Sequence, residues 1–201
     1  LQDPGRREYL EVVVKEADRI NRMVDHMLDF ARPQTLKLAP TNVHKILEDI
    51  LVLEKKSMTA KQVEFVQDYD PSLPLIEADE DKLKQVFFNL IKNAVEASPK
   101  GGNVRLVTRI NSDYSVPSAR ARNARMSVLI EIVDSGPGIS EEDQKKLFTP
   151  FYTTKTKGSG LGLPISLKII EDHRGKIKIL SGKTQGATAQ VFLPIQQGNN
   201  R

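Results

Sequence analysis

The chain has 201 residues, of which 39% are hydrophobic and 28% charged, and its formal net charge is +4. These values are ordinary for a globular protein with one well-packed domain and a smaller second element. The absence of cysteine excludes disulfides, thiolate catalysis and cysteine zinc sites. No apolar run reaches the roughly 18 residues of a transmembrane helix. Residues 1–5 are polar, unlike a signal peptide, and the start at Leu1 indicates a piece of a longer protein.

Residues 6–32 are predicted to form one long helix. Apolar residues recur in it at alternating steps of three and four, the pattern of a coiled coil or helical bundle. They are Leu10, Val13, Ala17, Ile20, Val24, Met27 and Ala31. A seam that regular must be covered by another segment of the chain or by a second subunit, so we expect dimerisation through this helix. A linker, residues 33–40, is bracketed by two prolines and separates the helix from a second domain.

The second domain is expected to span residues 41–195, followed by a disordered tail, residues 196–201. Helices are predicted at 43–59, 80–98 and 162–173, with a helical turn at 147–151. Strands are predicted at 63–69, 75–78, 104–110, 126–133, 176–180 and 187–194. Asn42 and Asp79 are expected to cap the first two helices, and Ile46, Leu47, Ile50 and Leu53 to face inward. The fold class is therefore α+β, a two-layer sandwich with helices on one face of a mixed sheet.

Asn89 and Asn93 lie four residues apart on the helix predicted at 80–98. Residues at this spacing share one helix face, so both amides project from the same side. An amide offers its carbonyl oxygen to a hard cation and its N–H groups to phosphate oxygens. The pair suits a Mg²⁺ ion that bridges phosphates, although two ordinary surface amides would look the same.

Two glycine-rich segments follow. Asp134 ends a predicted strand and precedes Gly136 and Gly138, so a carboxylate is placed where glycines let the backbone approach a flat base. The run Gly158–Gly162 carries glycine at alternate positions before a predicted helix, whose first amides can bind phosphates. Its spacing is neither that of a P-loop nor that of a dinucleotide-binding fold. Each segment alone is also compatible with a simple turn.

In this order, the segments resemble the ATP-binding domain of sensor histidine kinases, in the GHKL superfamily that includes DNA gyrase. The N-box is similar to Asn89–Ala97, the first glycine box to Asp134–Ile139, the F-box to Leu147–Phe151 and the second glycine box to Gly158–Leu163. Helix 6–32 resembles the second helix of the dimerisation and phosphoacceptor hairpin. The short lid after the F-box and the long basic loop at 111–125 resemble nitrogen-regulation and sporulation kinases.

The resemblance implies that ATP and Mg²⁺ bind here. It makes Asn93 the Mg²⁺ ligand, Asn89 a phosphate or Mg²⁺-shell contact, and Asp134 the anchor of adenine, joined by Thr188. It gives catalytic roles to Asn89 and Lys155, the latter meeting phosphates together with Lys157 from the lid. The other implied nucleotide-binding residues are Gly136, Gly138, Ile139, Phe151, Gly158, Ser159, Gly160, Leu161, Gly162 and Leu163.

ATPase members of the superfamily carry glutamate where Asn89 stands, as the base that activates water. An amide cannot accept that proton at neutral pH, so we expect ATP to be held for transfer to a histidine. None of the chain's three histidines matches the phosphoacceptor motif of the family: His26 is expected to be a helix-surface residue, and His44 and His173 are expected to be structural. The acceptor is therefore expected upstream. Arg174 stands where glycine is commoner in the family.

The implied function is transfer of the ATP γ-phosphoryl to that histidine and then to an aspartate of a response regulator, through positioning and charge neutralisation. The expected partners are ATP, a second copy of the chain and a receiver domain, and no nucleic acid. Loop 111–125 is either a contact for the regulator or a solvated loop. We expect a cytoplasmic portion of a parent that is cytoplasmic or anchored in the inner membrane. Two alternatives remain: a GHKL ATPase or clamp, and a nucleotide-sensing module that transfers nothing.

Overall fold

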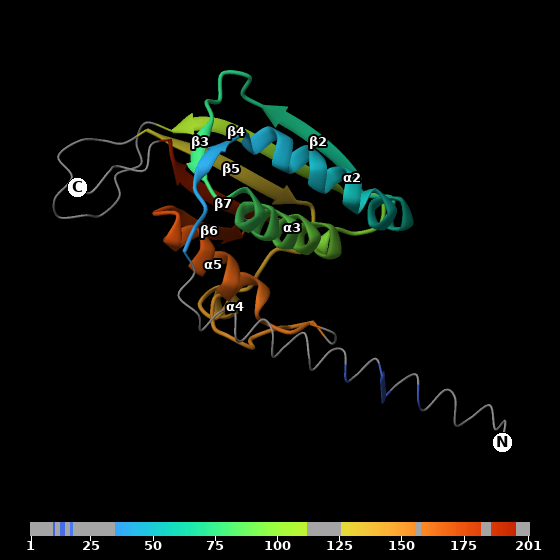
Figure 1. Ribbon diagram of the computed structural model, residues 1–201. Coiled ribbons are helices and arrows are strands. Elements are labelled where there is room, and N and C mark those ends of the chain that lie inside the picture. The colour runs from blue at the N-terminus through green and yellow to red at the C-terminus, as the bar shows by residue number, and fades with distance from the viewer. Residues whose placement is uncertain are drawn as a thin grey trace.

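The computed structural model describes most of the second domain and only four residues of the predicted first helix (Figure 1). The described residues are 10, 13, 14, 17, 35–111, 126–155, 158–181 and 186–195, without the side chains of 56–60. Leu10, Val13, Val14 and Ala17 are helical and exposed. The rest of the predicted helix, including His26, lies outside the described residues, as do residues 112–125, Lys157 and the tail.

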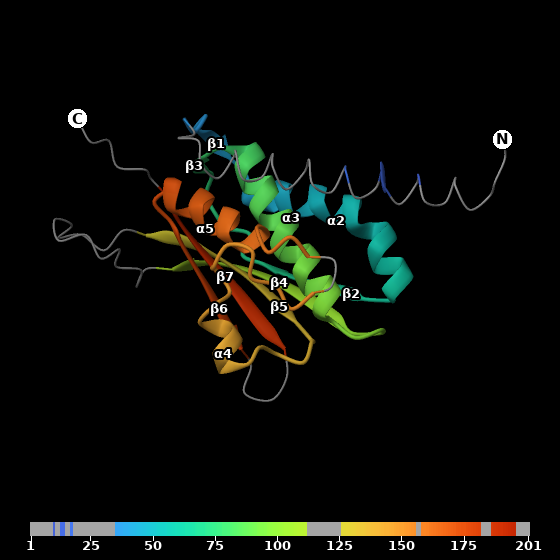
Figure 2. The ribbon, with the colours of Figure 1, turned by 90° about the horizontal axis from the view of Figure 1, so that it is seen from below.

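The domain is built on a five-stranded sheet with strand order β2-β4-β5-β7-β6. The strands are β2 (Glu64–Tyr69), β4 (Asn103–Asn111), β5 (Ser127–Asp134), β6 (Lys176–Ser181) and β7 (Ala187–Pro194). β2 and β4 are parallel, and every other pair in this sheet is antiparallel. Helices α2 (Val43–Lys61), α3 (Glu80–Ala97) and α5 (Gly162–Asp172) cover one face of the sheet (Figures 1 and 2). The two-layer α+β fold is therefore confirmed.

The core lies between α3 and the sheet. Seven residues of α3 are buried: Leu83, Val86, Phe87, Leu90, Ile91, Ala94 and Val95. They meet buried strand residues of the sheet, among them Leu106, Ile130 and Ile132. Each large apolar side chain removed from water contributes about 1.5–3 kcal/mol, so this stripe fixes which face of α3 is left for polar residues. Among the described residues, no helix combines the length and apolarity needed to cross a membrane.

Both predicted helix caps are present. The Lys45 N–H donates to Asn42 Oδ1 (3.3 Å) at the start of α2, and the Lys82 N–H donates to Asp79 Oδ1 (3.1 Å) at the start of α3. The other oxygen of Asp79 accepts from the Lys37 N–H (2.9 Å). A single carboxylate thus satisfies a free amide of α3 and ties the preceding chain to the same helix end.

Three local expectations differ from the structure. A strand, β1 (Ala39–Thr41), pairs antiparallel with β3 (Ile76–Ala78), so part of the predicted linker belongs to a small second sheet. Leu53 is 70% exposed, because the inward stripe of α2 continues from Ile50 to Glu54, one full turn on, and Glu54 is buried. Leu53 therefore lies outside the buried face of α2.

The predicted helical turn at 147–151 is also wrong, since the helix in this region is α4 (Glu141–Gln144). Ser140 caps it by accepting a hydrogen bond from the Asp143 N–H (3.1 Å). Residues 145–151 form turns instead. Pro150 accounts for the difference, because proline lacks an N–H and disfavours helical geometry in the residue before it.

His173 joins the end of α5 to the start of α3. It has no exposed surface, and its Nε2 accepts a hydrogen bond from the Asp79 N–H (3.0 Å). Its Nδ1 lies 2.7 Å from the Ile169 carbonyl oxygen, which can only accept, so Nδ1 carries the proton and the ring is neutral. The expected structural role of His173 is confirmed. His44 is also structural, stacking on Tyr69 with ring centroids 4.8 Å apart.

Arg174 takes the left-handed conformation, with φ of +59°, directly after His173. The Gly175 N–H donates to the Ile170 carbonyl (2.8 Å), which closes the end of α5. A left-handed residue with a Cβ costs about 1–2 kcal/mol. This is the consequence of having arginine where glycine is commoner.

The stability of the domain should depend on the neutral state of His173. Burial lowers the pKa of this imidazole below its ordinary value. Below about pH 6.5 the unfolded chain therefore binds a proton that the folded chain does not, and the free energy of unfolding should fall by up to about 1.4 kcal/mol per pH unit. Urea unfolding followed by circular dichroism between pH 7.5 and 5 measures this slope. His173→Gln should be less stable at pH 7 and show a shallower slope; an unchanged slope contradicts the assignment.

Candidate functional site

Asn89 is fixed against the beginning of α5. Its Nδ2 donates to Ser166 Oγ (3.0 Å). Its Oδ1 lies so close to Gly162 that a Cβ at that position would come within 2.3 Å of it. Only glycine can occupy position 162 without moving Asn89. The helix that carries Asn89 and the second glycine segment, which are far apart in the sequence, therefore pack directly against each other.

Asn93 contacts the predicted lid. Its Oδ1 accepts a hydrogen bond from Lys155 Nζ (2.8 Å), and the same ammonium forms an ion pair with Glu96. Asn93 is partly buried, whereas Lys155 and Glu96 are exposed. The amide oxygen of Asn93 is therefore already in contact with a cation, which is the property required of a Mg²⁺ ligand.

Asp134 ends β5 and organises the loop that follows. Its Oδ1 accepts hydrogen bonds from the Gly136 N–H (2.8 Å) and the Ala187 N–H (3.1 Å). Both of these bonds go to the same oxygen, which leaves Oδ2 as an acceptor for a ligand. Thr188 follows Ala187 and stands opposite Val133, the residue before Asp134, in the β5–β7 register. The sheet thus places the two predicted adenine contacts on neighbouring strands.

The first glycine segment packs on the end of α3. A Cβ at position 136 would lie 2.8 Å from the Ala97 carbonyl oxygen. Further along, Gly138 has a φ of +82°, and the Ile139 N–H donates to Ser181 Oγ (2.9 Å) at the end of β6. The loop therefore runs from α3 to the far edge of the sheet.

The second glycine segment is locked to Phe151. The Phe151 N–H donates to the Gly160 carbonyl (3.1 Å), and both residues have positive φ, +66° and +68°. A Cβ at position 160 would come within 2.4 Å of the Phe151 carbonyl carbon, so this approach requires glycine. Phe151 is 58% exposed. Leu161, buried at the start of α5, offers no side-chain cap to the first amides of that helix.

Together, these contacts arrange the predicted residues along α3. Asn89, Asn93 and Ala97 follow one another at steps of four and share one face, and the axial rise from first to last is about 12 Å. The second glycine segment contacts Asn89, Lys155 contacts Asn93, and the first glycine segment contacts Ala97. The structure thus brings together all the predicted segments, whereas Lys157 lies outside the described residues.

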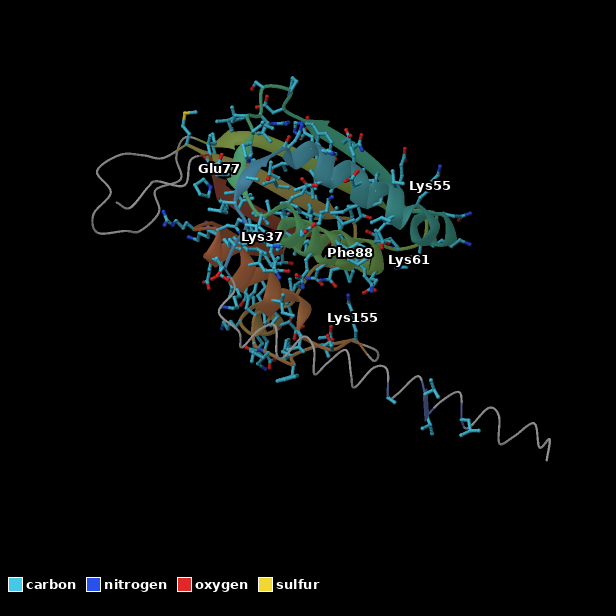
Figure 3. The ribbon with its side chains drawn as sticks, in the orientation of Figure 1. Lys37, Lys55, Lys61, Glu77, Phe88 and Lys155 are labelled. Carbon is cyan, nitrogen blue, oxygen red and sulfur yellow. The ribbon has the colours of Figure 1, made fainter. Side chains whose placement is uncertain are left out.

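Two residues at the site were not predicted. Glu96 lies one turn beyond Asn93, and this spacing could have pointed to it. Lys61 ends α2, and its ammonium donates to the carbonyls of Val95 (3.1 Å), Glu96 (2.7 Å) and Ser98 (2.8 Å) at the end of α3 (Figure 3). It satisfies carbonyls that the helix itself leaves free and places a positive charge at the negative end of its dipole. No sequence spacing reveals that contact.

The start of the lid is anchored to α4. The Tyr152 hydroxyl donates to Asp143, and Lys146 lies over the Tyr152 ring, 5.9 Å from its centroid. The hydrogen bond from Tyr152 lowers the pKa of Asp143 and raises the pKa of Tyr152. In the described part of the chain, no group of three or more histidine, aspartate or glutamate side chains is placed to hold a metal ion by itself.

Residues 78–197 match the family described as histidine kinase-, DNA gyrase B- and HSP90-like ATPase. The chain belongs to this family. It is similar to the signal transduction histidine-protein kinase AtoS of Escherichia coli K12, with 40% identity over 98% of this chain and 31% of the relative. It shares 34% identity with sporulation kinase C of Bacillus subtilis, over 97% of this chain and 43% of that protein. It shares 36% identity with the sensory histidine kinase/phosphatase NtrB of Klebsiella oxytoca, over 98% of this chain and 55% of that protein.

Solved structures agree with this family. The catalytic domain of histidine kinase ThkA has a TM-score of 0.67 at 31% identity, covering 80% of this chain and 97% of that one. ThkA in complex with the response regulator protein TrrA has a TM-score of 0.74 at 28% identity, covering 97% of this chain and 53% of that one. Full-length ShkA in complex with AMPPNP has a TM-score of 0.76 at 25% identity, covering 98% of this chain and 40% of that one.

These similarities confirm the predicted family and a histidine-kinase ATP-binding catalytic domain of GHKL type. The relatives include the sensory histidine kinase/phosphatase NtrB and a sporulation kinase. The chain spans between about a third and about half of the length of the curated relatives described above.

Proposed function

We propose that this chain is the catalytic core of a two-component sensor histidine kinase, which transfers the γ-phosphoryl of ATP to a histidine in another segment of its longer parent. From there, the phosphoryl passes to an aspartate of a response-regulator receiver domain. The observation that carries the proposal is the contact between the two asparagines of α3, the glycine segment before α5 and Lys155. It gathers amide, backbone N–H and ammonium groups where a triphosphate needs them.

Each end of the nucleotide has a matching group. Asp134 Oδ2 suits the exocyclic amine of adenine, while Asp134 Oδ1 holds the loop in place through Gly136 and Ala187. Thr188 lies beside this anchor in the sheet register. At the other end, the uncapped first turn of α5 offers backbone N–H groups and the positive end of a helix dipole to phosphate oxygens.

Mg²⁺ fits the donor set at Asn93. Asn93 is only partly buried and its amide oxygen already accepts from an ammonium, and the phosphates and water would supply the remaining oxygen ligands that this ion prefers. When bound, the ion neutralises phosphate charge. The chain itself positions the triphosphate through Asn89, Asn93 and the helix amides, and Lys155 supplies a mobile positive charge.

Hydrolysis is disfavoured by the same geometry. Asn89 donates one N–H to Ser166 and its oxygen lies against Gly162, so its orientation is fixed, and an amide is not a base that takes a proton from water. This favours transfer to a protein nucleophile over the alternative of an ATPase clamp. It also assigns Asn89 a positioning role.

Two further partners belong to the proposal. Leu10 and Val13 of the N-terminal helix are 65% and 62% exposed, which supports pairing of this helix with a second copy of the chain. The solved complex of ThkA with a response regulator supports a receiver domain as the phosphoryl acceptor. Because ATP and a receiver domain would both be met in the cytoplasm, we expect this portion of the parent to lie there.

The adenine anchor can be tested with Asp134→Asn. The variant keeps a carbonyl oxygen for the Gly136 and Ala187 N–H groups but replaces the adenine-facing acceptor by a donor. Loss of a hydrogen bond to a charged group costs about 1.5–3 kcal/mol, so the Kd for an ATP analogue should rise about ten- to a hundredfold. Calorimetric titration measures it, with Asp81→Asn on the exposed side of α3 as the control. An unchanged Kd rules out the anchor.

The metal role of Asn93 can be tested with Asn93→Ala. In the wild-type protein, Mg²⁺ should tighten binding of the ATP analogue, because Asn93 would hold the ion and the ion would supply positive charge to the phosphates. In the variant, titrations with and without Mg²⁺ should give similar Kd values. Gln85→Ala, two turns earlier on α3, serves as the control. A normal Mg²⁺ response in Asn93→Ala removes Asn93 from the metal site.

Phosphoryl transfer requires the full-length parent. Incubation with γ-labelled ATP should give a phosphoprotein whose label is acid-labile and base-stable, as expected of phosphohistidine, and which a receiver domain removes. Asp134→Asn should lose this labelling through weaker ATP binding. Steady-state release of phosphate without a labelled protein would support the ATPase alternative, and ATP binding without either would support a nucleotide-sensing module.

A further inference from the structure

Lys155 lies between two polar groups of α3. Its ammonium donates to Asn93 Oδ1 (2.8 Å) and to the carboxylate of Glu96. Asn93 and Glu96 are three residues apart and are neighbours on the helix surface. Figure 3 shows Lys155 on the loop that passes below α3. The lysine therefore links the lid to the helix that carries the proposed Mg²⁺ ligand.

The backbone around Lys155 holds this arrangement. The Lys155 N–H donates to Thr153 Oγ1 (3.1 Å), and the Lys155 carbonyl accepts from the Gly158 N–H (3.2 Å). A Cβ at position 158 would lie 2.4 Å from Thr153 Oγ1, so the turn closes tightly against a glycine. The Tyr152 hydroxyl is hydrogen-bonded to Asp143 just before this turn, so the backbone that carries Lys155 is anchored to α4.

Other ion pairs of the described chain differ from this one. Lys84 pairs with Glu80 and Asp49, Lys146 with Glu142, and Arg109 with Asp68. None of these pairs includes a predicted nucleotide-binding residue. The pair of Lys155 and Glu96 is comparably exposed, at 43% for both side chains, but its ammonium also occupies the oxygen of Asn93.

We propose that Glu96 is a positioning residue, which holds Lys155 at Asn93 while the site is empty and releases it to the phosphates when nucleotide binds. The proposal rests on the ATP and Mg²⁺ site proposed above. An ammonium and a Mg²⁺ ion at the same amide oxygen repel each other. Binding of Mg²⁺–ATP at Asn93 therefore favours departure of Lys155, and the phosphates provide its new anionic partner.

This exchange makes the lid responsive to the nucleotide. Without nucleotide, Glu96 keeps the Lys155 ammonium against α3. With it, the positive charge moves to the triphosphate, where it helps to neutralise the charge that develops during transfer. Glu96 thus opposes binding slightly and keeps the lysine within reach. Its effect should weaken at high salt, since both side chains are exposed.

A four-protein comparison tests the proposal: wild type, Glu96→Gln, Lys155→Met and the double variant. Each is titrated with a non-hydrolysable ATP analogue and Mg²⁺ at low salt. Exposed ion pairs of this kind correspond to about a 1.5- to fivefold change in an equilibrium constant. Glu96→Gln should therefore tighten binding by about two- to fivefold when Lys155 is present, and clearly less in the Lys155→Met background. Removal of simple repulsion between Glu96 and the phosphates would act equally in both backgrounds.

Equal effects of Glu96→Gln in the two backgrounds, or weaker binding by Glu96→Gln, would overturn the proposal. Glu80→Gln is the matched control, because it breaks an ion pair at the other end of the same helix. It should leave the Kd unchanged. Titration at about 0.5 M salt should shrink the difference between backgrounds, as expected of screened charges.

A second measurement does not depend on nucleotide. In the empty protein, the side-chain amide signal of Asn93 in an NMR spectrum reports its contact with Lys155. Glu96→Gln should shift that signal in the wild-type background but not in the Lys155→Met background. If wild type fails to bind the analogue, the proposed function is wrong, whereas an Asn93 signal insensitive to Glu96→Gln in a protein that binds the analogue overturns only the holding role of Glu96.

Discussion

The packing of α3 against the sheet is the constraint on which the site depends. Its buried stripe, from Leu83 to Val95, fixes the rotation of the helix about its axis. With that rotation set, Asn89, Asn93 and Ala97 fall on a second face, at the interval of one turn, and meet the two glycine segments and the lid. A helix turned by one residue would bury an asparagine and expose a core side chain, so the hydrophobic pattern and the chemistry are specified together.

Both ends of α3 are held by polar contacts that reach across the fold. At its start, Asp79 caps the helix, and the Asp79 N–H donates to the neutral ring of His173 at the end of α5. At its end, the ammonium of Lys61 donates hydrogen bonds to three backbone carbonyls. Such contacts add only about 1 kcal/mol or a little more each, but they limit sliding of the helix along its axis. In the proposed function, the placement of Asn93 relative to the triphosphate would depend on that restraint.

Much of this could be predicted from the sequence, because the signals were local. The caps at Asn42 and Asp79, the strand alternation and the glycine segments each follow from a few adjacent residues. What could not be predicted depends on residues far apart in the chain: the β1–β3 pair, the reach of Lys61, and the contact of Lys155 with Glu96. The prediction that Leu53 faces inward was wrong for a different reason. Two possible inward stripes on α2 differ by one residue, and the stripe that contains Glu54 is the one that packs against the core.

The choice of amides over carboxylates decides what the site can do with a nucleotide. A glutamate at position 89 would add a base beside the phosphates, whereas an asparagine held between Ser166 and Gly162 adds only shape and hydrogen bonds. The carboxylate next to Asn93, that of Glu96, is already engaged with Lys155. If the site binds and orients phosphates as proposed, the absence of a base at Asn89 favours a nucleophile that needs no deprotonation before it attacks, and a neutral imidazole is such a nucleophile at physiological pH.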